Sequence, residues 1–231
     1  MTGTILNIIT VIVGGLIGLF FSGRFPERIK NTLISGIGLF IAGYGFYNFL
    51  ETNNPLIVLG SLLIGALLGE WWKIEDGLNG LGAFFESRFK NNGKDSSLFI
   101  RGFLSASVIF CSGPIAIMGS IQDGLTGDFN ILATKAVLDG IVAMVFASSL
   151  GVGVIFSVFI ILIYQGSISL LANQLNQVVT PAMMAELTAV GGILLLGIAI
   201  SSLLKIKTIR IGNFIPALFI APLIVFILSI I

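Results

Sequence analysis

The chain has 231 residues, of which 56% are hydrophobic and 10% are charged, and its mean hydropathy is +1.07. Apolar runs of about 18 residues or more recur along it, so the composition excludes a soluble globular protein and predicts a multi-pass membrane protein. The net charge of +1 excludes a field that would attract nucleic acid. The single cysteine excludes an internal disulfide, and the absence of histidine removes the commonest general base and metal ligand.

The first half of the sequence contains three predicted membrane helices, at 4–21, 32–50 and 55–72. Gly14 and Gly18 give the first of them a small face for close helix packing. The pair Asn54-Pro55 is a start signal for the third, because asparagine caps helices and proline is favoured in the first turn. No basic segment precedes the first apolar run, so we expect a retained helix there rather than a signal peptide.

Residues 73–97 form the long polar segment of the sequence. Apolar side chains recur at helical spacing among its charged residues, at Leu78, Leu81, Phe85 and Phe89. The pattern predicts a cytoplasmic amphipathic helix on the membrane surface. A connector helix packed on the bundle explains it equally well.

The second half contains five predicted membrane helices, at 98–120, 131–149, 151–171, 186–204 and 214–231. With the N-terminus outside, the basic loops after the first, third and seventh helices all fall in the cytoplasm, as the positive-inside rule requires. We therefore predict an all-α polytopic membrane protein that forms one integral domain over residues 1–231, with eight transmembrane helices and both termini outside.

Two glycine-rich stretches, 35–45 and 189–199, are similar, and each is followed by a helix with a proline near its start, Pro55 or Pro216. If the first three helices correspond to the last three, the offset of five helices gives the two copies opposite orientations. Inverted repeats are the architecture of many secondary transporters, with the site near mid-membrane. Any two apolar glycine-rich helices also align passably, so chance similarity explains the stretches equally well.

The polar residues of the membrane region concentrate between Phe110 and Gly140. Ser112-Gly113-Pro114 lies near the middle of the helix predicted at 98–120. Serine caps helices and proline costs a hydrogen bond inside one, so this stretch predicts either a kink or a break that leaves free helix ends in the membrane interior. With acids close by in the sequence, we favour the break, which in transporters binds anions or small cations.

Asp139 lies near the centre of the next predicted helix, and Lys135 is four residues earlier on the same face. An unpaired carboxylate there is costly, so Asp139 is expected to be paired, protonated or bound to a cation. A structural Lys135–Asp139 ion pair and a functional carboxylate explain the pattern equally well. Asp123 is expected in the loop after residue 120, Gln165 is a candidate cavity residue, and Glu186 is expected to cap the helix that it opens.

Six stretches together resemble a known family: 110–114, 119–125, 138–140, 164–166, 187–192 and 213–218. They are similar to the bacterial YqgA/YdfK-like membrane proteins, a family catalogued as a domain of unknown function. The resemblance covers nearly the whole chain and implies a protein of the bacterial cytoplasmic (inner) membrane. It supplies no catalytic or binding residue, and relatives often carry another small residue at the position of Ser112.

These observations predict a secondary transporter of a small solute or ion, with Na⁺ or H⁺ as the coupling ion. Its candidate binding residues are Asp139, Lys135, Cys111, Ser112, Gly113, Asp123 and Gln165. Asp139 is expected to respond to a cation or a proton, with Lys135 as its partner. The backbone at 111–114 is expected to contact the ligand, and Asp123 to lie at the outer mouth.

Two alternatives stay open: an ion channel, and a structural or regulatory membrane protein that acts through residues 73–95. An enzyme is not expected, since serine and zinc membrane proteases need histidine. The sequence predicts no cofactor and assigns no metal ligand. The expected partners are the lipid bilayer and a small solute or monovalent cation, without nucleic acid. The glycine faces allow a homodimer and serve packing within the bundle equally well.

Overall fold

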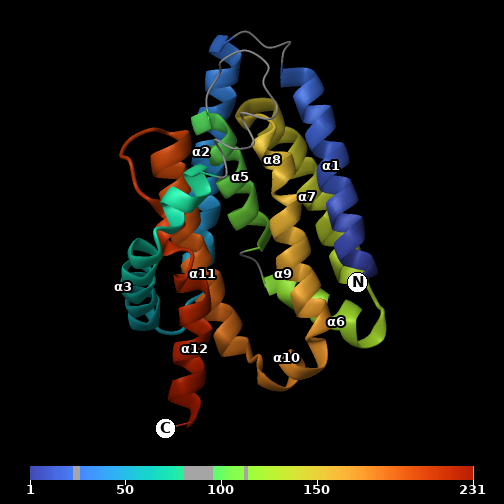
Figure 1. The fold of residues 1–231 in the computed structure, drawn as a ribbon, viewed down its shortest axis with the longest axis vertical. Coiled ribbons are helices and arrows are strands. Elements are labelled where there is room, and N and C mark those ends of the chain that lie inside the picture. Colours follow the sequence, from blue (N-terminus) through green and yellow to red (C-terminus); the bar gives the residue numbers. More distant parts are fainter. Residues whose placement is uncertain (23–26, 81–95, 112–113, 231) are drawn as a thin grey trace. The chain divides into compact units, whose positions relative to one another are not determined.

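A computed structural model describes residues 1–22, 27–80, 96–111 and 114–230. This part of the chain is helical and contains no strand (Figure 1). The elements are α1 (Thr2–Ser22), α2 (Glu27–Phe49), α3 (Pro55–Trp72), α5 (Ser96–Cys111), α6 (Pro114–Thr126), α7 (Asn130–Leu150), α8 (Gly153–Phe156), α9 (Val158–Leu170), α10 (Ala172–Val178), α11 (Pro181–Ile198), η1 (Ala199–Leu203), η2 (Ile211–Phe214) and α12 (Ala217–Ile230). Residues 74–80 are also helical.

Six helical segments of the described residues are long and apolar enough to cross a membrane: Thr2–Ser22, Pro55–Trp72, Asn130–Leu150, Gly153–Leu170, Pro181–Ser201 and Ile211–Ile230. Helices α5 and α6 form a seventh candidate as a bent pair, in which Leu98–Cys111 and Ile115–Thr126 differ in direction by 63°. The structure confirms an all-α polytopic membrane protein. The number of eight transmembrane helices stays a prediction, because it requires α2 to cross the membrane as well.

The surfaces of these helices are apolar, as contact with lipid requires. Leu56, Leu67 and Trp71 on α3 are 73%, 74% and 77% exposed. Such a row of large exposed apolar side chains is unusual on a water-soluble protein and is the ordinary outer face of a membrane helix.

The described contacts divide the chain into two compact units. Unit 1 contains residues 1–34 and 101–179, and unit 2 contains residues 35–100 and 180–231. Each unit contains three of the six candidate spans, so the division does not separate a soluble part from a membrane part. The predictions of one integral domain and of an inverted repeat stay predictions.

In unit 1, α1 packs along α7, and the second half of the bent pair, α6, packs against α9. Figure 1 shows α1 (blue) beside α7. A side chain on α9 joins it to α6, since Ser169 Oγ donates a hydrogen bond to the Ser120 carbonyl at 3.0 Å.

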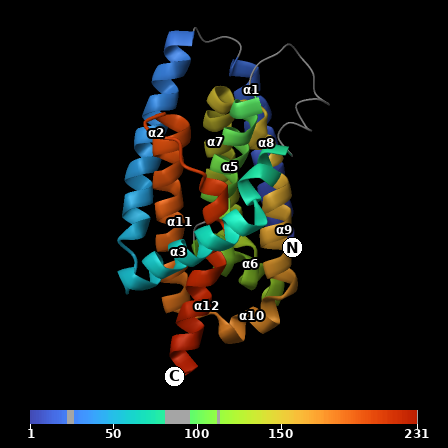
Figure 2. The same cartoon turned by 60° about the vertical axis from the view of Figure 1, so that its left-hand side comes forward.

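In unit 2, α2 packs on α11 and α3 packs on α12 (Figure 2). A Cβ added at Gly45 would lie 2.6 Å from the Gly192 carbonyl oxygen, so both glycines are needed for the approach of α2 to α11. Val58, Val190 and Ala217 belong to the small core between α3, α11 and α12. The glycine faces of both units therefore serve packing within the chain, and a homodimer stays a prediction.

Helix boundaries follow the local start signals. Helix α3 covers the predicted 55–72, because Asn54 caps it by accepting from the Leu56 amide and Pro55 is its first residue. Helix α11 begins five residues earlier than predicted, at Pro181, because Thr180 accepts from the Met183 amide in the same way. Most of the predicted amphipathic segment, residues 81–95, lies outside the described residues.

Candidate functional site

Glycines on one face of α1 bring its backbone against α7. A Cβ added at Gly14 would overlap the Gly140 carbonyl, and one at Gly18 would overlap the Met144 carbonyl. Only residues without a side chain allow this approach. Asn7 precedes Gly14 by about two turns on the same face. The glycines therefore carry its amide side chain into the contact with α7.

Lys135 and Asp139 lie on one face of α7, as their spacing predicts. Lys135 Nζ donates a hydrogen bond to Asp139 Oδ2 and forms an ion pair with it. Both side chains are buried, with 8% and 10% of their surface exposed. The predicted pair therefore forms within unit 1, near the middle of a candidate membrane span.

Asn7 supplies a second donor to the same carboxylate oxygen. Its Nδ2 lies 2.9 Å from Asp139 Oδ2, and Asn7 itself is fully buried. A buried carboxylate requires compensation by charge and by hydrogen bonds. Lysine provides the charge here, and the asparagine on the neighbouring helix adds the hydrogen bond.

Phe110, near the end of α5, lies close to this pair. Lys135 Nζ lies 5.8 Å from the centroid of the Phe110 ring, within the range of a cation–π contact. Cys111, the next residue of α5, is buried. Two predicted site residues, Lys135 and Asp139, are thus in direct contact, and the ring of Phe110 brings α5 to them.

The position of Asp123 differs from the predicted one. It lies inside α6, which continues to Thr126, and it is 3% exposed, so it is neither in a loop nor exposed at a mouth. Its Oδ2 accepts from the Gly3 amide at 3.0 Å and lies 3.1 Å from the Met1 α-amino nitrogen. These contacts make Asp123 a cap for the first turn of α1, where amide groups lack partners within the helix.

Gln165 is completely buried on α9, and neither its Oε1 nor its Nε2 has a hydrogen-bond partner among the described residues. Buried amides are ordinarily bonded, so this side chain is a candidate for contact with a ligand or water. The two remaining predicted site residues, Ser112 and Gly113, lie outside the described residues.

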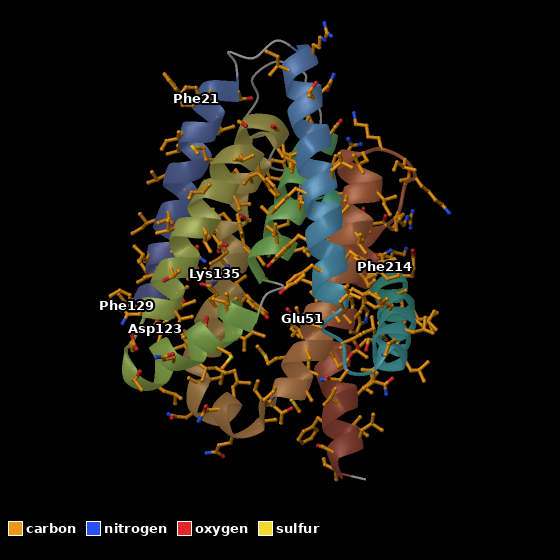
Figure 3. All side chains as sticks on the ribbon, turned by 180° about the vertical axis from the view of Figure 1, so that it is seen from behind. Phe21, Glu51, Asp123, Phe129, Lys135 and Phe214 are labelled. Carbon is orange, nitrogen blue, oxygen red and sulfur yellow. The ribbon has the colours of Figure 1, made fainter. Side chains whose placement is uncertain are left out.

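Figure 3 labels Lys135 on α7 and Asp123 on α6, both in unit 1. All five of the predicted site residues that the structure describes belong to this unit. Lys135 and Asp139 form one cluster with Asn7 and Phe110, whereas Asp123 contacts the start of α1.

Asn7 and Phe110 also belong to the cluster, although the sequence pattern does not predict them as site residues. Asn7 is a polar residue within the first apolar run and lies seven residues before Gly14, on the packing face of the helix. That position was the available signal. The sequence gives no signal for its partner, because Asp139 is 132 residues further along the chain.

Unit 2 also contains a buried carboxylate, Glu186, whose role differs from the prediction. Glu186 lies within α11 and does not cap it. Its oxygens accept from the Thr52 hydroxyl at 2.7 Å and from the amides of Asn53 and Asn54 at 2.8 and 2.9 Å. Glu186 therefore holds the turn between α2 and α3, and these three contacts give it a structural role.

Glu75 holds another turn of unit 2, outside the candidate spans. Its Oε2 accepts from the Gly212 amide at 2.7 Å, and its own amide donates to Asn213 Oδ1 at 2.8 Å. Burial raises the pKa of the Glu75 carboxyl above 4.5, although the hydrogen bond from Gly212 and the charge of Arg210 act in the opposite direction.

Comparison with known proteins gives consistent matches over the whole chain. The family described as "Protein of unknown function (DUF554)" matches residues 2–226. The chain is 36% identical over 222 residues to the uncharacterised protein YqgA of Escherichia coli (strain K12), covering 95% of this chain and 94% of that protein. It is 31% identical over 232 residues to the uncharacterised membrane protein YdfK of Bacillus subtilis (strain 168), covering 99% and 97%. No solved structure matches. The chain therefore belongs to the DUF554 family, which includes YqgA and YdfK.

Proposed function

We propose that this membrane protein transports a small solute or ion, with the cluster of Asn7, Lys135 and Asp139 as part of its binding site. The observation that carries the proposal is the buried Lys135–Asp139 pair within a candidate span. A charged side chain at the centre of a membrane helix costs about 2.5–3.5 kcal/mol on insertion scales, so such residues are retained chiefly where they have a function.

A purely structural role accounts less well for the pair. An apolar pair of similar size is often as stable as a buried ion pair, because desolvation offsets the Coulomb attraction. The packing of α1 on α7 is already provided by Gly14, Gly18 and Gly140. The charges are thus not needed to hold the two helices together.

The bent pair α5 and α6 supports the proposal. In one unit with the cluster, α5 ends at Cys111 and α6 begins at Pro114, and their directions differ by 63°. Helix ends inside a membrane have polar backbone groups without partners in the helix, and these persist only against protein or a water-filled cavity. Secondary transporters use such interrupted helices to bind solutes and coupling ions.

The proposal includes the location and the chemical class. We place the protein in the bacterial cytoplasmic membrane with both termini outside, from the distribution of its basic loops. Transport is preferred to enzymatic catalysis because the chain lacks histidine. Coupling to Na⁺ or H⁺ is part of the proposal, since Asp139 is the acidic group of the cluster.

Solid-supported-membrane electrophysiology on proteoliposomes tests the proposal. Na⁺ and pH jumps are applied with and without a panel of small carboxylates and amino acids, to the wild type, to Asp139→Asn and to the control Asp76→Asn. Asp76 is an exposed acid outside the candidate spans. We expect a saturable current in the wild type and the control that is lost in Asp139→Asn.

Equal currents in all three proteins would remove Asp139 from the mechanism. No current under any condition, with folded protein in the liposomes, would contradict transport and favour a structural or regulatory role. A current that does not saturate would favour a channel.

A further inference from the structure

We infer that Lys135 occupies the cation position of Asp139, so that the wild-type site takes no alkali cation and becomes a Na⁺ site when the lysine is removed. If the protein is a transporter as proposed, Na⁺ is then not the coupling ion at Asp139, and this consequence rests on the proposed function. The binding claim itself depends only on the contacts of the cluster.

The lysine charge lies where a bound cation would lie. Lys135 Nζ is in direct contact with Asp139 Oδ2, and both side chains are about nine-tenths buried. An ammonium group is a compact point charge, so it neutralises a carboxylate much as a bound monovalent cation would. Since Lys135 is attached to the same helix one turn away, it competes with a free ion at a high effective concentration.

Asn7 is oriented for a carboxylate that has no bound cation. Its Nδ2 donates to Asp139 Oδ2, which suits a carboxylate already neutralised by lysine. Its Oδ1 is buried without a hydrogen-bond partner among the described residues. An alkali ion bound to Asp139 would instead attract the amide oxygen, because such ions prefer oxygen ligands. The asparagine presents its donor where a cation site would present its acceptor.

Removal of the lysine would leave oxygen groups and space for a cation. Lys135→Ala leaves the Asp139 carboxylate buried without its counter-charge and empties the volume of the lysine side chain. Rotation of the Asn7 amide by half a turn exchanges its nitrogen and oxygen and brings the unpartnered Oδ1 to the carboxylate. A Na⁺ ion then meets one charged and one neutral oxygen group in a space that lysine had filled.

Thermal unfolding of the purified protein in detergent tests the inference, in NaCl and in choline chloride at equal ionic strength. The proteins are the wild type, Asp139→Asn, Lys135→Ala and the double variant Lys135→Ala/Asp139→Asn. Lys135→Met is a matched control, because it removes the charge and refills the volume. A ligand that binds only the folded state raises the unfolding temperature in a saturable way.

We expect a saturable rise with NaCl in Lys135→Ala alone. The wild type, Asp139→Asn, the double variant and Lys135→Met should unfold at the same temperature in both salts. A folded Lys135→Ala that does not respond to Na⁺ would overturn the inference. So would a wild type whose unfolding temperature rises with NaCl and whose response is lost in Asp139→Asn.

Equilibrium binding of ²²Na⁺ to the wild type and to Asp139→Asn needs no lysine variant and applies even if Lys135→Ala does not fold. Equal binding by the two proteins supports the inference, and binding that requires Asp139 overturns it. Neither measurement uses transport. Proteoliposomes without any current would therefore reject the proposed function. The Na⁺-dependent unfolding and the ²²Na⁺ binding would still decide the inference.

Discussion

At the scale of single residues, Asp139 shows how a carboxylate is accommodated inside a membrane bundle. It forms an ion pair with Lys135 on its own helix and accepts a hydrogen bond from Asn7 on α1. Both donors reach the same oxygen, Oδ2, and both belong to buried residues. The pair is thus neutral as a whole, which reduces the cost of burying each charge.

Replacement of Asn7 by alanine should lower the free energy of unfolding by about 1–2 kcal/mol, because it removes a hydrogen bond to a buried charged group. Denaturant titration in mixed micelles measures the change. The loss should be smaller in the Asp139→Asn background, since the two side chains interact directly. Equal losses in both backgrounds would show that the contact contributes nothing to stability.

Glu75 gives a prediction on pH, because burial raises its pKa in the folded protein above the ordinary 4.5. At pH values between 4.5 and the raised pKa of the folded protein, the folded state binds more protons than the unfolded state. The contribution of Glu75 to stability therefore falls as pH rises. Glu75→Gln keeps an acceptor for the Gly212 amide and does not ionise. Its unfolding temperature relative to wild type should therefore increase from pH 4.5 to pH 7. A difference that is constant or decreases with pH would contradict this assignment.

At the scale of elements, close helix contacts and the first helix of the bent pair determine where the polar cluster lies. The glycine face of α1 sets its distance from α7 and carries Asn7 to Asp139. Helix α5 brings Phe110 to the same cluster. The candidate site is therefore built by three helices of unit 1.

Gly14→Ala should destabilise the protein by about 1–3 kcal/mol, because the added methyl group meets the Gly140 backbone carbonyl, which cannot rotate away. Gly43→Ala is the matched control, since nothing lies within 4 Å of a Cβ at Gly43. The control should be neutral or stabilising, as alanine favours helix by about 1 kcal/mol over glycine. Unfolding temperatures of both variants measure the difference, and equal values would refute the close contact of α1 with α7.

At the scale of the whole molecule, what the sequence could predict depended on how local the signals are. The start of α3 followed from Asn54-Pro55, and the i, i+4 spacing of Lys135 and Asp139 predicted their contact. The polar but uncharged stretch before residue 186 concealed the equivalent start signal Thr180-Pro181. Helix periodicity could have placed Asn7 on a packing face. Its hydrogen bond to Asp139 is a tertiary contact, which has no local signal in the sequence.

Glu186 was misassigned for the same reason. Its predicted role was a cap for its own helix, which is the commonest local use of an acid at that position. The structure instead gives it three donors from the turn at residues 52–54, more than 130 residues earlier in the chain. Contacts of this separation depend on which helices pack together, and one sequence does not show that.

The predicted orientation of the protein can be tested by labelling single cysteines in intact cells. Replacement of Cys111 by alanine removes the natural cysteine, which is buried. In that background, Glu51→Cys should react with a membrane-impermeant maleimide from outside, and Lys207→Cys only after lysis, because the basic loop is predicted to be cytoplasmic. Both positions are exposed, and Figure 3 labels Glu51. Reaction of both from the same side would contradict the predicted topology.

The most direct test of the central claim replaces the buried ion pair by an apolar one, in the double variant Lys135→Met/Asp139→Leu. The solute-evoked current in proteoliposomes is measured together with the unfolding temperature. We expect a folded protein without the saturable wild-type current. Its stability should fall by no more than about 1–2 kcal/mol, because apolar replacement of a buried pair is often neutral or stabilising, whereas the hydrogen bond from Asn7 is lost. An unchanged current in this variant would show that the pair serves packing alone and would contradict the proposed site.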